Sequence, residues 1–347
     1  MNGHNGAAGG RRRERISEDM TSRLTTASLS PEEKARISRR LQALNCFDPW
    51  NSPLCTCGPK LSLDAYAGCG NECFYCYAAS YNWRYWGREL VRPKTDLIAR
   101  LQRDLRKIAA AEDADFARLA GMWVALSNSS DPYPQLPAAD EADLRLTRRA
   151  LELLRAAAMR VLITTKSPLV VRDLDVLDPA RSAITMTITT LDADLAAQME
   201  PLAPSPQARL AALSACAGRG FGVACRLDPV IPGLNDDEEG WERLCGELAD
   251  AGVRQVISST LKLQPKSARH YRERFPDAAT AAMPLYGPTD PDGYRRMHDE
   301  MRRDLMTRLK QVVEAHGMGF AVCREGMPEL NTGACDGRGL AGGAVND

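Results

Sequence analysis

Three cysteines in one short loop constrain this chain more than any other feature of its sequence. Cys69, Cys73 and Cys76 follow an apolar, β-rich run at residues 61–67 with the spacing C-x3-C-x2-C. Cysteine thiolates are the usual ligands of iron–sulfur clusters. Three of them leave one iron of a [4Fe–4S] cluster open, and that iron can chelate the amino and carboxylate groups that S-adenosylmethionine (SAM) offers. Zinc favours four ligands, commonly from two C-x2-C pairs, so this spacing favours a cluster over a zinc site or three buried thiols.

Short apolar runs alternate with longer amphipathic stretches along most of the chain. Strict alternation of strand and helix predicts parallel strands joined by right-handed crossovers. Besides the run at 61–67, strands are expected at residues 122–127, 161–165, 183–188, 222–227, 255–260 and 319–323. Helices are expected at residues 96–111, 140–158, 205–219, 237–251 and 294–316. The fold class is therefore α/β, although periodicity alone does not separate a doubly wound sheet from a barrel.

The two ends of the chain differ in composition from its centre. Residues 1–29 are rich in Gly, Arg, Ser and Thr and lack hydrophobic periodicity, which predicts a disordered tail. A helix then begins at Ser30-Pro31-Glu32-Glu33, where Ser30 and Glu33 can form a capping box. We expect a short helical extension over 30–57, the α/β domain over 58–325 and a mobile, Gly-rich C-terminal tail over 326–347.

Composition narrows the class of protein. No stretch approaches the roughly 18 apolar residues needed to span a bilayer, and the basic N-terminus has no apolar run behind it, so it is not a secretory signal. A cytoplasmic location is expected, where 11 cysteines indicate metal or redox chemistry rather than disulfides. The 45 Lys and Arg residues balance 45 Asp and Glu residues, and this zero net charge weighs mildly against a nucleic-acid partner.

Motifs beyond the cysteine loop carry a resemblance to a known family. In order along the chain they are Ser130-Asp131-Pro132-Tyr133, Leu146-Thr147-Arg148-Arg149, Thr164-Thr165-Lys166-Ser167, Ile188-Thr189-Thr190-Leu191-Asp192, Glu200-Pro201-Leu202-Ala203-Pro204-Ser205 and Asp228-Pro229-Val230-Ile231-Pro232-Gly233. With the loop, they resemble the radical SAM superfamily, and within it the spore photoproduct lyase-like branch, often labelled DNA-repair photolyase. The resemblance covers residues 58–325. It implies a partial (β/α)6 barrel with the cluster and SAM at the carboxyl ends of the strands, as is usual on parallel α/β scaffolds.

The implied barrel assigns cofactor-binding roles to residues near strand ends and in the cysteine loop. These residues are Tyr75, Ser127, Ser130, Asp131, Lys166, Thr189, Thr190 and Arg226. Tyr75 would shield the cluster and contact the adenine, and residues 127–131 would meet the methionyl amino group or the ribose. Lys166 would pair with the SAM carboxylate, the threonines with the ribose hydroxyls, and Arg226 with the carboxylate or the substrate. Structural ion pairs for Lys166 and Arg226, and helix capping by the threonines, are the alternatives.

Four further cysteines form a second candidate group. Cys55 and Cys57 precede the first strand, Cys323 ends the last strand, and Cys335 follows in the tail. Together they could bind an auxiliary iron–sulfur cluster or zinc. However, a strand of five or six residues separates the two ends of the barrel by roughly 17–20 Å, so the tail could bridge this gap only by folding back. Alternatively, Cys323 acts alone as a catalytic residue that donates a hydrogen atom or touches substrate.

The resemblance implies an enzyme of lyase or transferase type that cleaves SAM to a 5′-deoxyadenosyl radical. The preferred substrate is a small molecule, such as a nucleoside, sugar or lipid, in biosynthetic carbon–carbon bond formation or rearrangement. The expected partner is an electron donor: a reductase, flavodoxin or ferredoxin. Repair of a DNA photoproduct and a non-catalytic iron–sulfur sensor are the alternatives. The aromatic segment 81–86 could stack on a base or sugar, or pack the first helix.

Overall fold

A computed structural model describes residues 29–48, 52–80, 87–127, 129–136 and 144–342, and an eight-stranded sheet lies at its centre. In spatial order the strands are β1 (Asn45–Cys46), β2 (Lys60–Leu63), β5 (Trp123–Leu126), β6 (Arg160–Thr165), β7 (Ser182–Thr187), β8 (Gly222–Val230), β9 (Gln255–Thr260) and β12 (Gly319–Val322). Neighbouring strands from β2 to β12 are parallel, and β1 pairs antiparallel with β2. Within the described residues β1 and β12 remain edges, so the sheet is an open, partial barrel, as expected.

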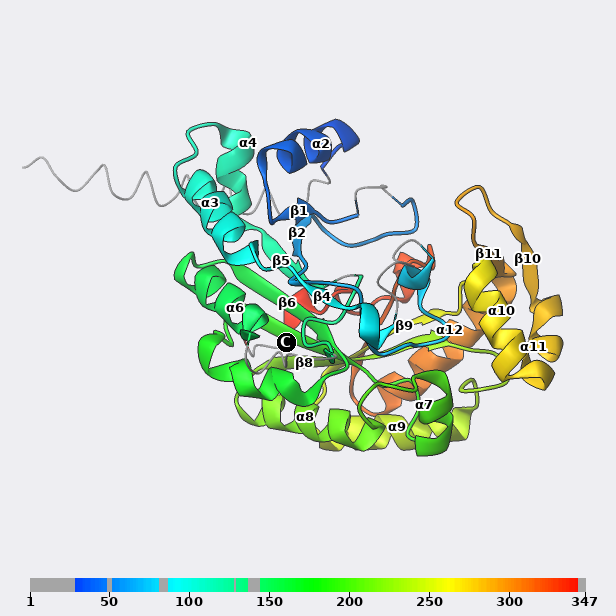
Figure 1. Ribbon diagram of the computed structural model, residues 1–347. Helices are drawn as coiled ribbons and strands as arrows, with labels where there is room; N and C mark the ends of the chain where they lie inside the picture. Colours follow the sequence, from blue (N-terminus) through cyan, green and yellow to red (C-terminus); the bar gives the residue numbers. More distant parts are fainter. Residues whose placement is uncertain (1–28, 49–51, 81–86, 128, 137–143, 343–347) are drawn as a thin grey trace, which may run out of the picture.

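Helices cover the outer face of the sheet. The predicted helices are found as α3 (Leu97–Ala109), α6 (Leu146–Ala156), α8 (Pro206–Gly218), α9 (Glu238–Asp250) and α12 (Asp299–Ala315). The first residues of the helix predicted over 140–158 lie outside the described residues. Figure 1 shows α6, α8, α9 and α12 lying along one side of the sheet. Side-chain caps set two of their starts, because Ser205 accepts a hydrogen bond from Ala208 N–H and Asp237 accepts one from Gly240 N–H.

The predicted N-terminal helix is present as α2 (Pro31–Arg40). The Ser30 hydroxyl accepts from Glu33 N–H at 3.2 Å, and the Glu33 carboxylate accepts from Ser30 N–H at 2.7 Å, which confirms the capping box. Residues 1–28, where a disordered tail was predicted, lie outside the described residues, but Leu29 is buried.

Two sequence expectations need correction. The run at 61–67 is not one strand: after β2 the chain turns, and β3 (Tyr66–Ala67) pairs with β4 (Arg92–Pro93) in a separate ribbon. The helix expected over 294–316 begins only at Asp299, because β11 (Arg295–Met297) pairs antiparallel with β10 (Tyr286–Thr289). Gly293, at φ 83°, supplies the turn of this hairpin.

Shorter elements complete the described chain. They are α4 (Ala114–Ala117), α7 (Ala193–Met199), α10 (Pro265–Arg274), α11 (Pro276–Ala282) and the 3-10 segments η1 (Tyr77–Ala79), η3 (Arg88–Leu90), η4 (Arg118–Gly121), η5 (Pro168–Val176), η6 (Met283–Leu285), η7 (Pro328–Leu330) and η8 (Arg338–Leu340). None of the helices in the described ranges has the length and apolar character that crossing a bilayer requires.

The C-terminal segment fills the concave face of the sheet instead of forming a mobile tail. Ala224, Ile257 and Ala321 point to this face from neighbouring strands, and Cys335 and Leu340 pack against them. The fit is close at Gly222, where an added Cβ would lie 2.0 Å from the Leu340 carbonyl oxygen. Residues 333–342 therefore form a floor under the barrel, which Figure 1 shows in red between the strands.

Candidate active site

The cysteine loop lies between β3 and η1, at the end of the sheet where the parallel strands finish. Cys73 is buried, whereas Cys69 and Cys76 are partly exposed, and all three thiols are free. The intervening Phe74 anchors the loop, since its ring is 1% exposed and stacks on Tyr271 with the centroids 5.7 Å apart. Phe74 thus anchors the loop backbone between Cys73 and Cys76.

Burial keeps two of these thiols protonated. It raises the pKa of Cys73 to about 12, and burial together with the charge of Asp131 raises the pKa of Cys69. Iron must therefore displace protons from the loop when it binds. Nowhere in the described chain are three His, Cys, Asp or Glu side chains arranged around a single metal ion, whereas the three thiolates of a [4Fe–4S] cluster each bind a different iron.

A buried carboxylate, Glu200, organises the polar side chains beside the loop. Its oxygens lie 2.5 Å from Arg209 Nη1 and 3.8 Å from Lys166 Nζ, and it accepts hydrogen bonds from the Tyr75 hydroxyl and, at 3.3 Å, from the Thr189 hydroxyl. Burial acts to raise the pKa of Glu200, but the charges of Lys166 and Arg209 outweigh it and the pKa lies below its usual range. Glu200 is therefore an anion held by two cations.

Lys166 is the cation of this group that can reach a ligand. Its side chain is 14% exposed, whereas that of Arg209 is 1% exposed. Burial acts to lower the pKa of Lys166, but the electrostatic interactions with the Cys73 thiol and the Glu200 carboxylate outweigh it and the pKa is raised, so the ammonium stays charged. It also lies 5.5 Å from the centre of the Tyr75 ring.

The segment after β5 contributes hydroxyls and a structural anchor. Ser127, in the left-handed region at φ 56°, and Ser130 have buried Oγ atoms for which the described residues supply no hydrogen-bond partner. Asp131, in contrast, accepts from the Thr165 hydroxyl at 2.6 Å and from Lys166 N–H at 2.8 Å. Asp131 ties the ends of β5 and β6 together, whereas the two serine hydroxyls are available to a ligand as far as the described residues show.

Thr190 and Arg226 also have structural partners. The Thr190 hydroxyl accepts from Asp192 N–H at 3.1 Å, just before α7. Arg226 Nη2 lies 2.5 Å from Asp228 Oδ2, and its guanidinium is also within hydrogen-bonding reach of the Cys323 thiol. Arg226 therefore lies close to the last strand and to Cys323, and farther along the sheet than Lys166, which follows β6.

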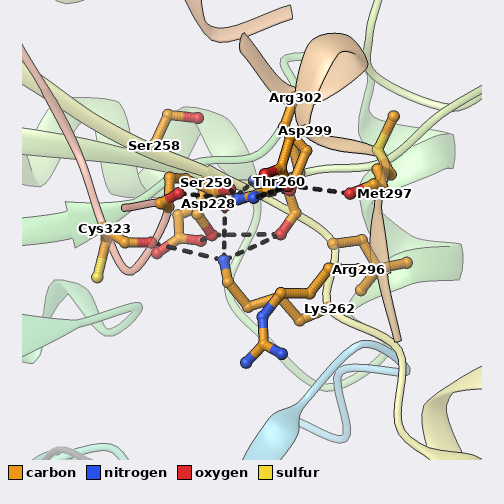
Figure 2. Close-up of polar contacts among 12 residues, drawn as sticks. Asp228, Ser258, Ser259, Thr260, Lys262, Arg296, Met297, Asp299, Arg302 and Cys323 are labelled. Carbon is orange, nitrogen blue, oxygen red and sulfur yellow. Dashed lines mark hydrogen bonds and ion pairs between the residues drawn. The ribbon is translucent and has the colours of Figure 1, made fainter. Parts of the chain in front are cut away.

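A second polar group occupies the carboxyl ends of β8, β9 and β12 (Figure 2). The Ser259 hydroxyl donates to Asp228 at 2.5 Å, and Lys262 Nζ lies 2.6 Å from Glu325 Oε1. Glu325 is 1% exposed and is also held by Arg302 Nη1 at 2.5 Å. We call this group the polar mouth; its members are Arg226, Asp228, Ser259, Lys262, Arg302 and Glu325. Its cations and carboxylates are paired, and the side chains of Lys262 and Asp228 remain partly accessible.

The structure brings together residues that the sequence placed apart. Tyr75, Lys166 and Thr189 meet at Glu200 as neighbours, although Glu200 and Arg209 were not predicted as site residues. In the sequence, Glu200 could have been found from the motif that begins with Glu200-Pro201, and Arg209 from its place on the apolar side of the predicted helix that became α8. Among the second group of cysteines, Cys57 and Cys335 are in contact at 3.1 Å between their Sγ atoms. The aromatic segment 81–86 lies outside the described residues.

These residues fit the predicted cofactors. One loop offers three free thiols, and the neighbouring residues include a charged ammonium and two buried hydroxyls that have no hydrogen-bond partner among the described residues, groups that could bind the carboxylate, amino and ribose groups of SAM.

Comparison with known proteins agrees with this chemistry. A family model described as the Radical SAM superfamily matches residues 64–245, just over half of the chain. An uncharacterized protein of Acidianus two-tailed virus is 29% identical over 218 residues, which cover 58% of this chain and 66% of the viral protein. An uncharacterized protein of Methanocaldococcus jannaschii is 30% identical over 206 residues, which cover 57% of this chain and 70% of that protein.

Solved structures share the fold. Spore photoproduct lyase complexed with dinucleoside spore photoproduct aligns with a TM-score of 0.59 and 17% identity, covering 90% of this chain and 93% of that one. Streptococcus suis SuiB bound to precursor peptide SuiA aligns with a TM-score of 0.50 and 12% identity, covering 95% of this chain and 58% of that one. At these identities the likeness concerns the fold alone.

Proposed function

The chain belongs to the radical SAM superfamily, and from that premise we propose that it abstracts a hydrogen atom from a small molecule bound at the polar mouth. Members of the superfamily are enzymes that use a [4Fe–4S] cluster and SAM and need a reductant and a substrate. When bound, the cluster would supply the electron that cleaves SAM, and this would provide the 5′-deoxyadenosyl radical for abstraction of a hydrogen atom from the substrate. The protein positions both molecules and excludes water.

We assign the cofactor contacts to the residues beside the loop. Cys69, Cys73 and Cys76 hold the cluster, and Lys166 pairs with the SAM carboxylate. The unpaired hydroxyls of Ser127 and Ser130 meet the amino group or the ribose. Tyr75 covers the cluster with the ring that its bond to Glu200 holds in place. Thr189 and Thr190 are proposed partners of the ribose, although each already makes a hydrogen bond to the protein.

The polar mouth carries the proposal of a small substrate. Its cations are matched by carboxylates, as in the pairs Arg226–Asp228 and Lys262–Glu325. A duplex-binding surface instead needs unmatched Lys and Arg side chains for the phosphates. A paired, partly accessible group suits a compact molecule with several hydroxyl or amide groups, such as a nucleoside or sugar. We propose a biosynthetic step that forms or rearranges a carbon–carbon bond in such a molecule.

Cys323 is proposed as the hydrogen donor that ends the reaction. It ends the last strand, and its thiol lies against Arg226 at the same mouth. In this step the S–H bond breaks, a C–H bond forms on the product radical, and a thiyl radical remains. One electron from the flavodoxin, ferredoxin or reductase that serves the cluster, together with one proton, restores the thiol.

Formation of 5′-deoxyadenosine tests the proposal. Anaerobically reconstituted protein with SAM and a reductant should form it faster when given the low-mass fraction of a cell extract. The Cys69→Ala, Cys73→Ala, Cys76→Ala triple variant is the control and should form none. Stimulation by ultraviolet-irradiated DNA, and none by the low-mass fraction, would overturn the small-molecule proposal in favour of photoproduct repair.

A further inference from the structure

Three thiols meet on the concave face of the barrel, away from the cysteine loop. The Sγ atoms of Cys57 and Cys335 are 3.1 Å apart, and the thiol of Cys55 is within hydrogen-bonding reach of Cys57. The hydroxyl of Thr56, which lies between Cys55 and Cys57 in sequence, donates to Cys335 Sγ at 3.6 Å. A bonded disulfide has its sulfur atoms only about 2.05 Å apart, so these are separate thiols in contact.

The chain reaches this arrangement because its C-terminal segment reverses direction after Cys323. Thr332 N–H donates to the Phe320 carbonyl at 2.8 Å, and the Ala334 carbonyl accepts from the Gln255 side chain at 2.9 Å. Phe320 and Gln255 lie near the starts of β12 and β9, so the segment runs back to the amino ends of the strands. Cys335 is thereby placed at the level of Cys57, which precedes β2. The C-terminal segment therefore folds back along the barrel, as a site shared by Cys57 and Cys335 requires.

Positive charge surrounds these thiols. Lys60, with 3% of its side chain exposed, lies 2.6 Å from Asp336 and close to the Cys57 thiol. Arg338 also pairs with Asp336, at 2.6 Å, and Arg324 pairs with Asp48 at 3.0 Å near Cys55. Three cations face two carboxylates, which leaves an excess of one positive charge. A metal ion bound by anionic thiolates would be compatible with this small excess of positive charge.

We propose that Cys55, Cys57 and Cys335 bind a zinc ion, with a water as the fourth ligand that zinc favours, and that this ion links the C-terminal segment to the chain just before β2. Two thiolates on one tetrahedral zinc, with Zn–S bonds of about 2.3 Å, lie about 3.8 Å apart. The contact of 3.1 Å between Cys57 and Cys335 needs only a small separation to reach this value. A cubane cluster would hold each thiolate on a different iron and farther apart. No metal position is preformed among the described residues, and this applies to the Cys69–Cys76 loop as much as to these thiols.

Metal content of the full-length protein tests the site. Protein purified without oxygen is compared with Cys57→Ser and Cys335→Ser by elemental analysis of zinc and iron. The control is Cys245→Ser, which alters a thiol buried in α9. We expect about one zinc per chain in the wild type, at least tenfold less in the two variants, and no loss in the control, with the iron of the loop unchanged.

Other results would overturn the proposal. They are wild-type protein without zinc, zinc that survives both substitutions, iron that depends on these thiols in place of zinc, or a Cys57–Cys335 disulfide in the anaerobically purified protein. If the variants fail to fold, cobalt exchange into the wild type provides the test. Thiolate-to-cobalt charge-transfer absorption that a thiol-blocking reagent abolishes would support the site, and its absence in cobalt-loaded protein would refute it. These measurements do not depend on SAM cleavage, so they separate this proposal from the proposed function.

Discussion

Replacing Lys166 with methionine separates a ligand-binding role from a structural one. The ammonium of Lys166 is 3.8 Å from Glu200, whereas Arg209 is 2.5 Å from the same carboxylate and the Tyr75 hydroxyl also bonds it. Glu200 therefore keeps its two closer partners in Lys166→Met. We expect a loss of folding stability of only about 1 kcal/mol.

The loss of SAM affinity should be larger. A charge-assisted hydrogen bond contributes about 1–3 kcal/mol, so the dissociation constant for SAM should rise about 5- to 150-fold. The assay is titration of SAM into anaerobically reconstituted protein, with iron content and urea unfolding measured on the same samples. Iron content should stay at the wild-type level.

Arg209→Met provides the contrast, because Arg209 is 1% exposed and is the closer of the two cations that hold Glu200. Removing one partner of a buried pair costs about 3–5 kcal/mol, so this variant should lose stability first. Unchanged SAM affinity in Lys166→Met, together with a loss of stability like that of Arg209→Met, would refute the ligand role and make Lys166 a structural cation.

Three further changes have defined outcomes. Cys323→Ala should retain iron, zinc and 5′-deoxyadenosine formation but stall or divert the product; loss of zinc would instead make Cys323 a fourth ligand of the thiol site. Asp104→Ala should lower the free energy of unfolding by about 3 kcal/mol or more. The reason is that the buried Asp104 carboxylate accepts hydrogen bonds from three backbone N–H groups, those of Gln42, Ala43 and Leu44. A loss below about 1 kcal/mol in urea unfolding would contradict this. Wild type should have a larger free energy of unfolding than Glu200→Gln above about pH 4.3, and this difference should shrink as the pH falls below that value, because the pKa of Glu200 is lowered in the folded state. A difference that does not change with pH would show that the charge of Glu200 is not what stabilises the fold.

The strands and the cysteine loop were predictable because their signals are local. Apolar runs placed β6 and β9 to within one residue, and the spacing of Cys69, Cys73 and Cys76 needs no knowledge of distant contacts. The hairpin before α12 was mistaken for helix, since Arg295–Met297 has no strand pattern of its own and depends on pairing with β10.

The parts that were missed depend on contacts between distant residues. Glu200 and Arg209 are ordinary charged residues in sequence, and only their shared burial beside Lys166 gives them a role. In the same way, a Gly-rich composition favoured a mobile tail, whereas the contacts of Leu340 with Gly222 and of Asp336 with Lys60 hold the segment in place.

The floor of the barrel also affects the order of folding. The bond between Lys60 and Asp336 joins residues 276 positions apart. Contacts with such large sequence separation have a high entropic cost of closure and form late. The helices and parallel strands can assemble while the concave face is still open to solvent, and the floor then docks as a final event. Amide protons of residues 333–342 should therefore be among the last to gain protection in a refolding pulse, after those of β6 to β8.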